Sequence, residues 1–186
     1  MVKYLLDSNC FIEPMKRYYS FKAFSSYWKW LNEELNKENS LLVISKCVAD
    51  EINVDPRLEK WTQEHFSNLV YDENRDPFVW PKYAEIINYV QNCGAYQTGS
   101  VNEWKKTGKA DPLLIAIASQ YNYQIVTFER ESGQFGYDVN DVNNEWNWKH
   151  NGGPIRHEPK IPDIAKHFGV SCITLFDLEE KLKLCI

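Results

Sequence analysis

Short apolar runs alternate along the chain with longer segments of helical periodicity. Val2 to Leu6 (interrupted only by Lys3) and Leu41 to Ile44 have the length and composition of buried strands. Gln124 to Phe128 and Cys172 to Leu175 repeat the pattern later in the chain. The sequence therefore predicts at least these four strands.

Apolar residues three and four positions apart predict helices between the strands. In Phe24 to Lys37 this spacing is carried by Phe24, Tyr27, Trp28, Leu31 and Leu35. The other segments predicted to be helical are Lys46–Asn53, Leu58–Leu69, Pro81–Asn92, Ser100–Lys106, Ala110–Tyr121, Ile161–His167 and Asp177–Leu184. Strands that alternate with helices in this way predict a three-layer α/β/α sandwich with a mainly parallel central sheet.

The length of 186 residues favours one domain over residues 1–186. Residues 132–158 differ in character, because Asn and Gly are frequent there and Phe, Tyr and Trp are interleaved with them. Long loops in compact domains are often functional. We expect this segment to be a polar and aromatic loop inserted into the domain.

No segment predicts a membrane span or a secretory signal. The longest apolar run, Leu113 to Ala118, is far shorter than the roughly 20 residues that cross a bilayer. The five cysteines include no Cys-x-x-Cys pair, which favours reduced thiols over a disulfide framework. These features predict a cytoplasmic protein without membrane contact.

The formal net charge of −5 argues against a protein that coats nucleic acid through bulk positive charge. It does not exclude a nucleic-acid enzyme, because bound metal ions can supply local positive charge. A charge count alone therefore does not decide between these classes.

Five acids lie directly after a predicted strand, in the helix that follows a strand, or at the start of a helix that leads into one. They are Asp7, Glu51, Asp111, Glu129 and Asp163. Ligands of parallel sheets collect at the carboxyl ends of the strands. Carboxylates gathered there repel one another unless a hard cation such as Mg²⁺ or Mn²⁺ binds between them.

Each acid also has a structural interpretation without chemistry. Asp7, Asp111 and Asp163 stand where a helix N-cap is expected, and an N-cap contributes about 1 kcal/mol on its own. Glu51 is equally consistent with a solvated helix residue, and Glu129 with a surface ion pair. Only the joint placement of the acids favours a site.

The motifs around these acids resemble those of the PIN-domain family of metal-dependent ribonucleases. The matching segments are Leu5–Asn9, Val48–Ile52, Ala110–Ala118 and Ile125–Glu129. The turn Lys160–Asp163 resembles a poorly characterised PIN-like subgroup. A departure is Glu at position 129, where the family has Asp or Asn.

The resemblance implies an endoribonuclease that hydrolyses RNA phosphodiester bonds, and a relation to toxins of type II toxin–antitoxin pairs. It implies Mg²⁺ or Mn²⁺ as cofactor, RNA as substrate, and an antitoxin protein or a second copy as candidate partners. By correspondence, the catalytic residues are Asp7, Glu51, Asp111 and Glu129, and Asp163 joins them as a metal ligand. Ser8, Asn9 and Thr127 are expected to orient a carboxylate or a water by hydrogen bonding.

Basic residues beside aromatic ones are candidate RNA contacts, because ammonium and guanidinium groups reach phosphates while rings stack on unpaired bases. The candidates are Lys16, Arg17, Lys105, Lys106 and Lys109. A solvated charged face over core aromatics is the alternative for each of them.

Two other functions stay open. A phosphohydrolase of haloacid-dehalogenase type normally needs Asp-x-Asp, and position 9 is Asn, so that general acid is missing. A non-catalytic PIN-like module would bind RNA or protein through the 132–158 loop. Dinucleotide, P-loop and nucleophile-elbow motifs are absent from the sequence, and the four histidines lack the spacing of a zinc site.

Overall fold

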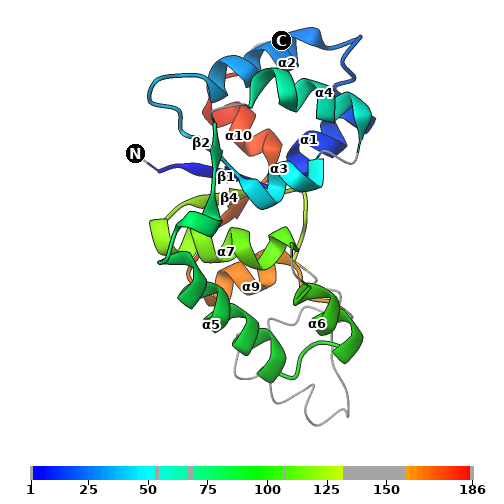
Figure 1. Cartoon of the computed structure of the whole chain (residues 1–186). Coiled ribbons are helices and arrows are strands. Elements are labelled where there is room, and N and C mark those ends of the chain that lie inside the picture. Colours follow the sequence, from blue (N-terminus) through cyan, green and yellow to red (C-terminus); the bar gives the residue numbers. More distant parts are fainter. Residues whose placement is uncertain (1, 53–54, 67–68, 107, 132–157, 185–186) are drawn as a thin grey trace.

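A computed structural model describes residues 2–52, 55–66, 69–106, 108–131 and 158–184. At its centre is a parallel five-stranded sheet with the strand order β3-β2-β1-β4-β5 (Figure 1). The strands are β1 (Tyr4–Leu6), β2 (Leu42–Ser45), β3 (Val70–Tyr71), β4 (Gln124–Val126) and β5 (Cys172–Ile173).

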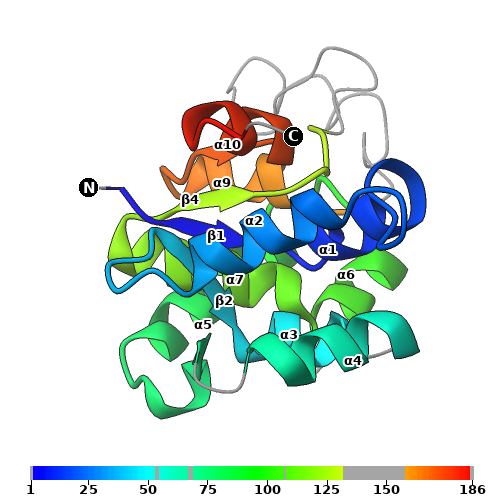
Figure 2. The same ribbon diagram turned by 90° about the horizontal axis from the view of Figure 1, so that it is seen from above.

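Helices cover both faces of this sheet (Figures 1 and 2). The helices α2 (Ser25–Leu35) and α10 (Leu175–Lys181) lie on one face. The other face carries α5 (Val79–Asn92), α7 (Ala110–Tyr121) and α9 (Ile161–His167). The predicted three-layer α/β/α sandwich with a parallel sheet is thereby confirmed.

Helix α7 is the centre of its layer. Every residue from Pro112 to Ala118 is buried, and the helix packs against α5, α9 and β4. A helix that is apolar on all sides is expected in the interior of a domain. It ends at Tyr121, and the next residue, Asn122, has a φ of 55°, the left-handed conformation that often terminates helices.

The remaining elements are shorter. After β1 come α1 (Asn9–Glu13) and the π-helix η1 (Pro14–Tyr18), and after β2 come α3 (Lys46–Ile52) and α4 (Pro56–His65). A 3₁₀ turn, η2 (Glu73–Arg75), follows β3, and α6 (Thr98–Trp104) precedes α7.

Several boundaries differ from the sequence prediction. The strands predicted at 124–128 and 172–175 end at Val126 and Ile173, and two further differences have a clear structural reason. The helix expected through Leu69 ends at His65, and the unpredicted strand β3 follows, because a two-residue strand carries no periodicity of its own. Helix α10 begins at Leu175 rather than Asp177. Thr174 is its N-cap, and Asp177 completes a capping box at the third helical position.

The chain order places a topological switch in the middle of the sheet. From β1 the chain moves outward through β2 to β3, then returns to β4 on the other side of β1 and continues to β5. Ligands of such sheets bind at the carboxyl ends of the strands where the order reverses. Here that point lies between Leu6 and Val126, which are register partners at the ends of β1 and β4.

Other predictions concern the chain as a whole. None of the helices in the described ranges is long and apolar enough to span a membrane. Cys10, Cys47, Cys93 and Cys172 are free thiols. The predicted loop falls outside the described residues except for Glu158, and the single domain over residues 1–186 stays a prediction.

Candidate functional site

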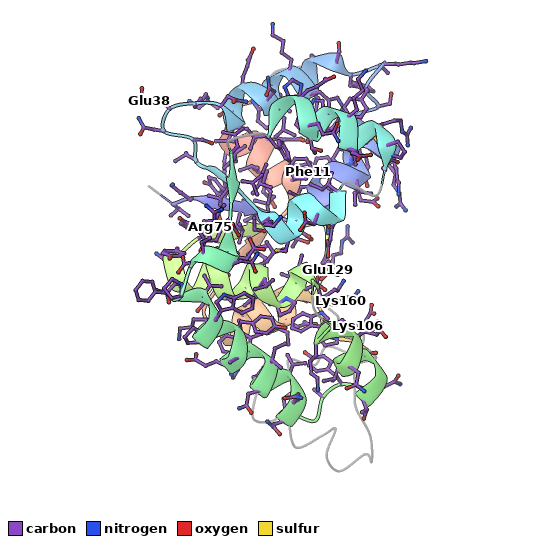
Figure 3. All side chains as sticks on the ribbon, in the orientation of Figure 1. Phe11, Glu38, Arg75, Lys106, Glu129 and Lys160 are labelled. Atoms are coloured by element: carbon purple, nitrogen blue, oxygen red, sulfur yellow. The ribbon has the colours of Figure 1, made fainter. Side chains whose placement is uncertain are left out.

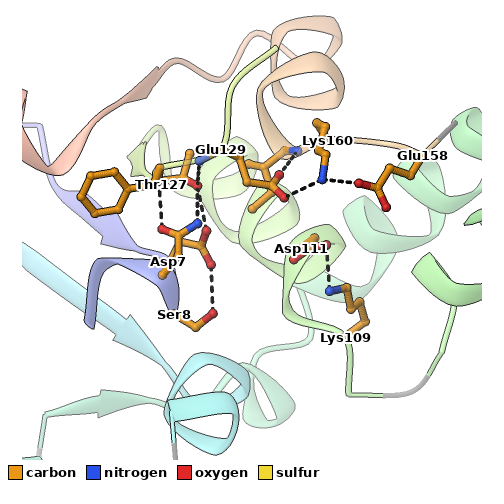
Figure 4. A network of polar contacts seen from close by, with 11 residues as sticks. Asp7, Ser8, Lys109, Asp111, Thr127, Glu129, Glu158 and Lys160 are labelled. Carbon is orange, nitrogen blue, oxygen red and sulfur yellow. Dashed lines mark hydrogen bonds and ion pairs between the residues drawn. The ribbon is translucent and has the colours of Figure 1, made fainter. Parts of the chain in front are cut away.

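Asp7 lies at the switch point of the sheet. It follows β1 directly, and its backbone N–H donates to the carbonyl of Val126 at 3.0 Å. The side chain is buried, and its Oδ2 accepts a 2.7 Å hydrogen bond from the hydroxyl of Thr127 (Figure 4). Ser8 Oγ reaches Oδ1 at 3.4 Å. The ends of two neighbouring strands therefore fix this carboxylate.

Asn9 and Thr127 hold the turn that follows β4. The Asn9 Nδ2 donates to Thr127 Oγ1 at 3.1 Å, and its Oδ1 accepts from the backbone N–H of Phe128 at 3.0 Å. The Glu129 N–H also donates to Thr127 Oγ1, at 3.0 Å. The predicted supporting residues thus meet in one network, which sets the direction in which the Glu129 side chain leaves the backbone.

Asp111 and Glu51 meet at the start of α7. Asp111 is the second residue of this helix, and its carboxylate pairs with Lys109 at 3.2 Å. Glu51 extends from α3, and its Oε1 accepts the N–H of Ala110, the first residue of α7, at 3.2 Å. A carboxylate at a helix start is stabilised by the unpaired N–H groups there.

Glu129 is held in a similar way at the start of α9. Its Oε2 accepts the N–H of Ile161 at 2.8 Å, and its Oε1 lies 3.4 Å from Lys160 Nζ. The same ammonium also pairs with Glu158. Lys160 therefore bridges two carboxylates at the edge of the site.

The capping interpretation of the three aspartates is wrong. The N-caps of α1, α7 and α9 are Ser8, Lys109 and Lys160, and none of the three makes a side-chain cap bond. Asp7 precedes α1 altogether, while Asp111 and Asp163 lie inside the first turns of α7 and α9. Glu51 and Glu129 accept the N–H groups of the first residues of α7 and α9.

Glu73 shows what a purely structural glutamate looks like in this fold. Its two oxygens accept the N–H groups of Lys46 and Cys47, the first residues of α3, at 2.9 and 2.8 Å, and it is 2% exposed. In contrast, Glu51 and Glu129 each give one oxygen to a helix start and also line an open pocket. Their placement leaves room for a ligand.

This pocket has a volume of about 390 Å³, within the range of ligand sites. Glu51, Asp111 and Glu129 lie along it, and α6 contributes Trp104 to its wall. Lys106, Lys109 and Lys160 also line it, and Figure 3 shows Lys106 and Lys160 beside Glu129. Acids and cations at one concave surface suit a phosphate ester that is bound together with a metal ion.

The negative charges of the four acids act on Asp7 and Glu129. Burial is the main reason why the pKa of Asp7 is raised to about 7; the bond from Thr127 opposes the shift, and the negative charges of Asp111, Glu129 and Glu51 add to it. Burial also raises the pKa of Glu129; the Ile161 N–H opposes this, and the charge of Asp111 adds to it. A cation bound among these carboxylates would relieve the repulsion.

The donor chemistry fits a hard divalent cation. Within the described ranges no three His, Cys, Asp or Glu side chains stand close enough to enclose a metal on their own. Mg²⁺ does not require such a cage, because it is usually held by one or two carboxylates and keeps several waters. Asp111 and Glu129 provide carboxylates at the pocket, and the buried Asp7 lies at the end of β1.

Other predicted residues are placed differently. Asp163 is buried at 3% exposed in α9 and is not among the residues that line the pocket. Lys105 follows α6 without lining the pocket, and Lys16 and Arg17 lie on η1, where Arg17 pairs with Glu13 at 2.9 Å. Of the five basic residues predicted to contact RNA, Lys106 and Lys109 line the pocket and the other three do not.

Lys160 is the main site residue that the sequence analysis did not single out. Its turn, Lys160 to Asp163, carries part of the resemblance, but the pattern assigns no role to the ammonium group. The available signal was a lysine directly before the helix start Ile161-Pro162. Its contact with Glu129 depends on tertiary structure, since 31 positions separate the two.

Comparison with known families gives one match. The sequence model of a family described as "Domain of unknown function (DUF4411)" matches residues 4–148. Neither the curated proteins nor the solved structures include a match. The matched span contains Asp7, Glu51, Asp111 and Glu129 and ends before Lys160.

Proposed function

The chain belongs to the family described as Domain of unknown function (DUF4411), and we propose that it is a metal-dependent endoribonuclease that hydrolyses RNA phosphodiester bonds. The resemblance of its motifs to PIN domains supports this activity. A role as the toxin of a type II toxin–antitoxin pair is the narrower form of the proposal and rests on that resemblance alone.

One observation carries the proposal. Asp7, Glu51, Asp111 and Glu129 come from four separate segments of the chain, and they converge at the topological switch of a parallel sheet. Three of them share a pocket with lysines. Scattered surface acids have no reason to meet at the place where such sheets bind ligands.

Asp111 and Glu129 are the residues that would hold Mg²⁺ or Mn²⁺, with Asp7 and Glu51 completing the acidic site. Such an ion supplies Lewis-acid stabilisation of a phosphoryl oxygen and lowers the pKa of a bound water. Thr127 fixes Asp7 through Oδ2, and Asn9 fixes Thr127. These bonds keep the acids in place, so little reorganisation is needed when the substrate binds.

The lysines contribute the positive charge that a phosphodiester needs. Burial alone would lower the pKa of Lys109 and Lys160, but nearby carboxylates raise the pKa of both, and the two ammonium groups stay charged. Lys109 pairs with Asp111, and Lys160 pairs with Glu129. Both cations are therefore positioned to contact the oxygens of a phosphate that binds beside these acids.

The experiment is an RNA cleavage assay with the purified protein and Mn²⁺ or Mg²⁺. Asp7→Asn and Asp111→Asn are expected to abolish cleavage, and EDTA is expected to abolish it in the wild type. Asp50→Asn is the matched control, because Asp50 is an exposed neighbour of Glu51 that pairs with Lys46 and not with the site. Cleavage that survives in EDTA or in both variants would contradict the proposal.

The same preparation tests the alternatives. Release of phosphate from a small monoester without RNA cleavage would indicate a phosphohydrolase, and RNA binding without turnover would indicate a non-catalytic module. A phosphohydrolase of haloacid-dehalogenase type would have its general acid at position 9. In this chain the Nδ2 and Oδ1 of Asn9 instead bond Thr127 and Phe128 and hold the turn between them. For the toxin role, expression is expected to arrest growth, and Asp7→Asn is expected to relieve the arrest.

A further inference from the structure

Three aromatic rings pack together beside the acids. Tyr18 ends η1, Phe128 follows β4, and Phe176 lies in the first turn of α10. Their ring centroids are 5.7 Å apart for Tyr18 and Phe128 and 5.4 Å apart for the two pairs with Phe176. We call these three residues the aromatic triad. Tyr18 is 42% exposed and Phe176 is 45% exposed, so large parts of both rings face solvent.

The triad and the acidic pocket flank one short segment of chain. Phe128 lies between Thr127, which bonds Asp7, and Glu129, which lines the pocket. Neither Tyr18 nor Phe176 lines that pocket. The triad is thus a separate surface that begins one residue away from the proposed cation site.

The rings are held in place before any ligand binds. The Phe128 backbone N–H donates to Asn9 Oδ1, and α10 starts with the capping box of Thr174 and Asp177. The hydroxyl of Tyr19 donates to Glu179 Oε2 at 3.1 Å, which ties η1 to α10. Because the elements that carry the rings are already fixed, binding orders few new side chains.

The charge nearby identifies the chemistry of a ligand. Lys16 and Arg17 directly precede Tyr18 on η1; Lys16 is exposed, and the Arg17 side chain is 69% exposed although it pairs with Glu13. Exposed rings beside cations are typical of surfaces that bind single-stranded nucleic acid, where bases stack and phosphates contact the charges. These cations favour an anionic ligand over an apolar protein partner.

We propose that the aromatic triad is a stacking platform for an unpaired RNA base next to the scissile phosphate. The proposal rests on the proposed function and extends it: the substrate is single-stranded where it crosses the site. One nucleotide would lie against Tyr18 and Phe176 while the adjoining phosphate lies at the acids. A continuous duplex keeps its bases paired and cannot use the platform.

The test measures binding of a labelled single-stranded oligouridylate by fluorescence anisotropy, in EDTA to prevent cleavage. Tyr18→Ala and Phe176→Ala are each expected to weaken binding about tenfold, the size of a lost base–aromatic stack. Tyr18→Phe and Phe176→Tyr keep a ring and are expected to bind like the wild type. Phe78→Ala is the matched control, since Phe78 is 65% exposed at the start of α5 and belongs to neither surface.

Abasic RNA separates stacking from a structural effect. If a base stacks on the triad, an oligonucleotide with abasic sites is expected to bind the wild type weakly. Its affinity for Phe176→Ala is then expected to be almost the same as for the wild type. Equal losses on normal and abasic RNA would overturn the proposal, as would a wild type that binds no single-stranded RNA. A changed oligomeric state with unchanged RNA affinity would also overturn it and indicate a protein-docking surface instead.

Cleavage with Mn²⁺ keeps this proposal distinct from the nuclease itself. Metal-dependent cleavage with the same KM in wild type, Tyr18→Ala and Phe176→Ala would contradict the platform and leave the nuclease standing. Ring-dependent RNA binding without any cleavage would contradict the nuclease and support the platform.

Discussion

Thr127 shows how one hydroxyl can organise a site. Its oxygen accepts N–H groups from Asn9 and Glu129, while its proton is donated to Asp7. The hydroxyl thereby uses its full bonding capacity. A sequence pattern cannot show this, because a threonine at the end of a strand is equally suited to β-branched packing.

Thr127→Val is therefore expected to keep the packing volume and lose the orientation of Asp7. Loss of an outer hydrogen-bond partner typically lowers metal affinity or activity about 10- to 100-fold. Isothermal titration with Mn²⁺ measures the effect, and Thr62→Val is the control, since Thr62 is also buried but donates to a carbonyl in α4. Unchanged affinity in Thr127→Val would show that Asp7 does not need this bond.

Glu51 and Glu73 make a matched pair for separating chemistry from stability. In Glu73→Gln an NH₂ group replaces one carboxylate oxygen, so one buried N–H at the start of α3 loses its acceptor. This is expected to reduce the free energy of unfolding by about 1–3 kcal/mol. Glu51→Gln is expected to abolish or strongly reduce cleavage with a smaller change in stability. Urea unfolding and RNA cleavage, measured for both variants, test this; the reversed pattern would contradict the assignment.

Glu179 predicts a pH dependence outside the acidic site. Burial raises its pKa from 4.5 to about 7, although the bond from Tyr19 opposes the shift. The folded state then holds the proton more tightly than the unfolded chain. The contribution of Glu179 to the free energy of unfolding is therefore largest below about pH 4.5. It declines as the pH rises toward 7 and is lost above that value.

Comparison of the wild type with Glu179→Gln isolates this effect. The stability of the wild type relative to the variant is expected to fall between pH 5 and 7, with a slope of at most about 1.4 kcal/mol per pH unit. Urea unfolding at several pH values gives the difference. A pH-independent difference would mean that Glu179 titrates near its ordinary pKa in the fold.

At the scale of elements, α7 joins the core to the site. Its buried face fixes the position of Asp111 in the first turn. Leu114 is fully buried, so Leu114→Ala is expected to lower the free energy of unfolding by about 2–5 kcal/mol. Denaturant unfolding measures this, and a loss below about 1 kcal/mol would show that the core collapses around the smaller side chain.

Elements with a strong pattern were predictable from the sequence. The apolar runs at β1 and β2 and the periodicity of α2 gave their type and approximate position. The short elements β3 and η1 were not predicted, because two to five residues carry too little periodicity and their conformation depends on neighbours. Helix caps were predicted wrongly where a glutamate distant in sequence, such as Glu129, bonds the helix start.

At the scale of the whole molecule, the strand order explains the site. The sequence places acids after strands, but only the order β3-β2-β1-β4-β5 makes Asp7 and Glu129 neighbours at a switch point. The convergence of four acids was expected from the alternation of strands and helices. The pairings with Lys109 and Lys160 and the position of the aromatic triad required the structure.

The central claim is that these acids bind a divalent cation, and a Mn²⁺ titration followed by electron paramagnetic resonance tests it most directly. The wild type and Asp50→Asn are expected to bind Mn²⁺ saturably, with competition by Mg²⁺, whereas Asp111→Asn and Asp7→Asn lose this binding. Identical titrations for all four proteins, or no binding by the wild type, would contradict the claim.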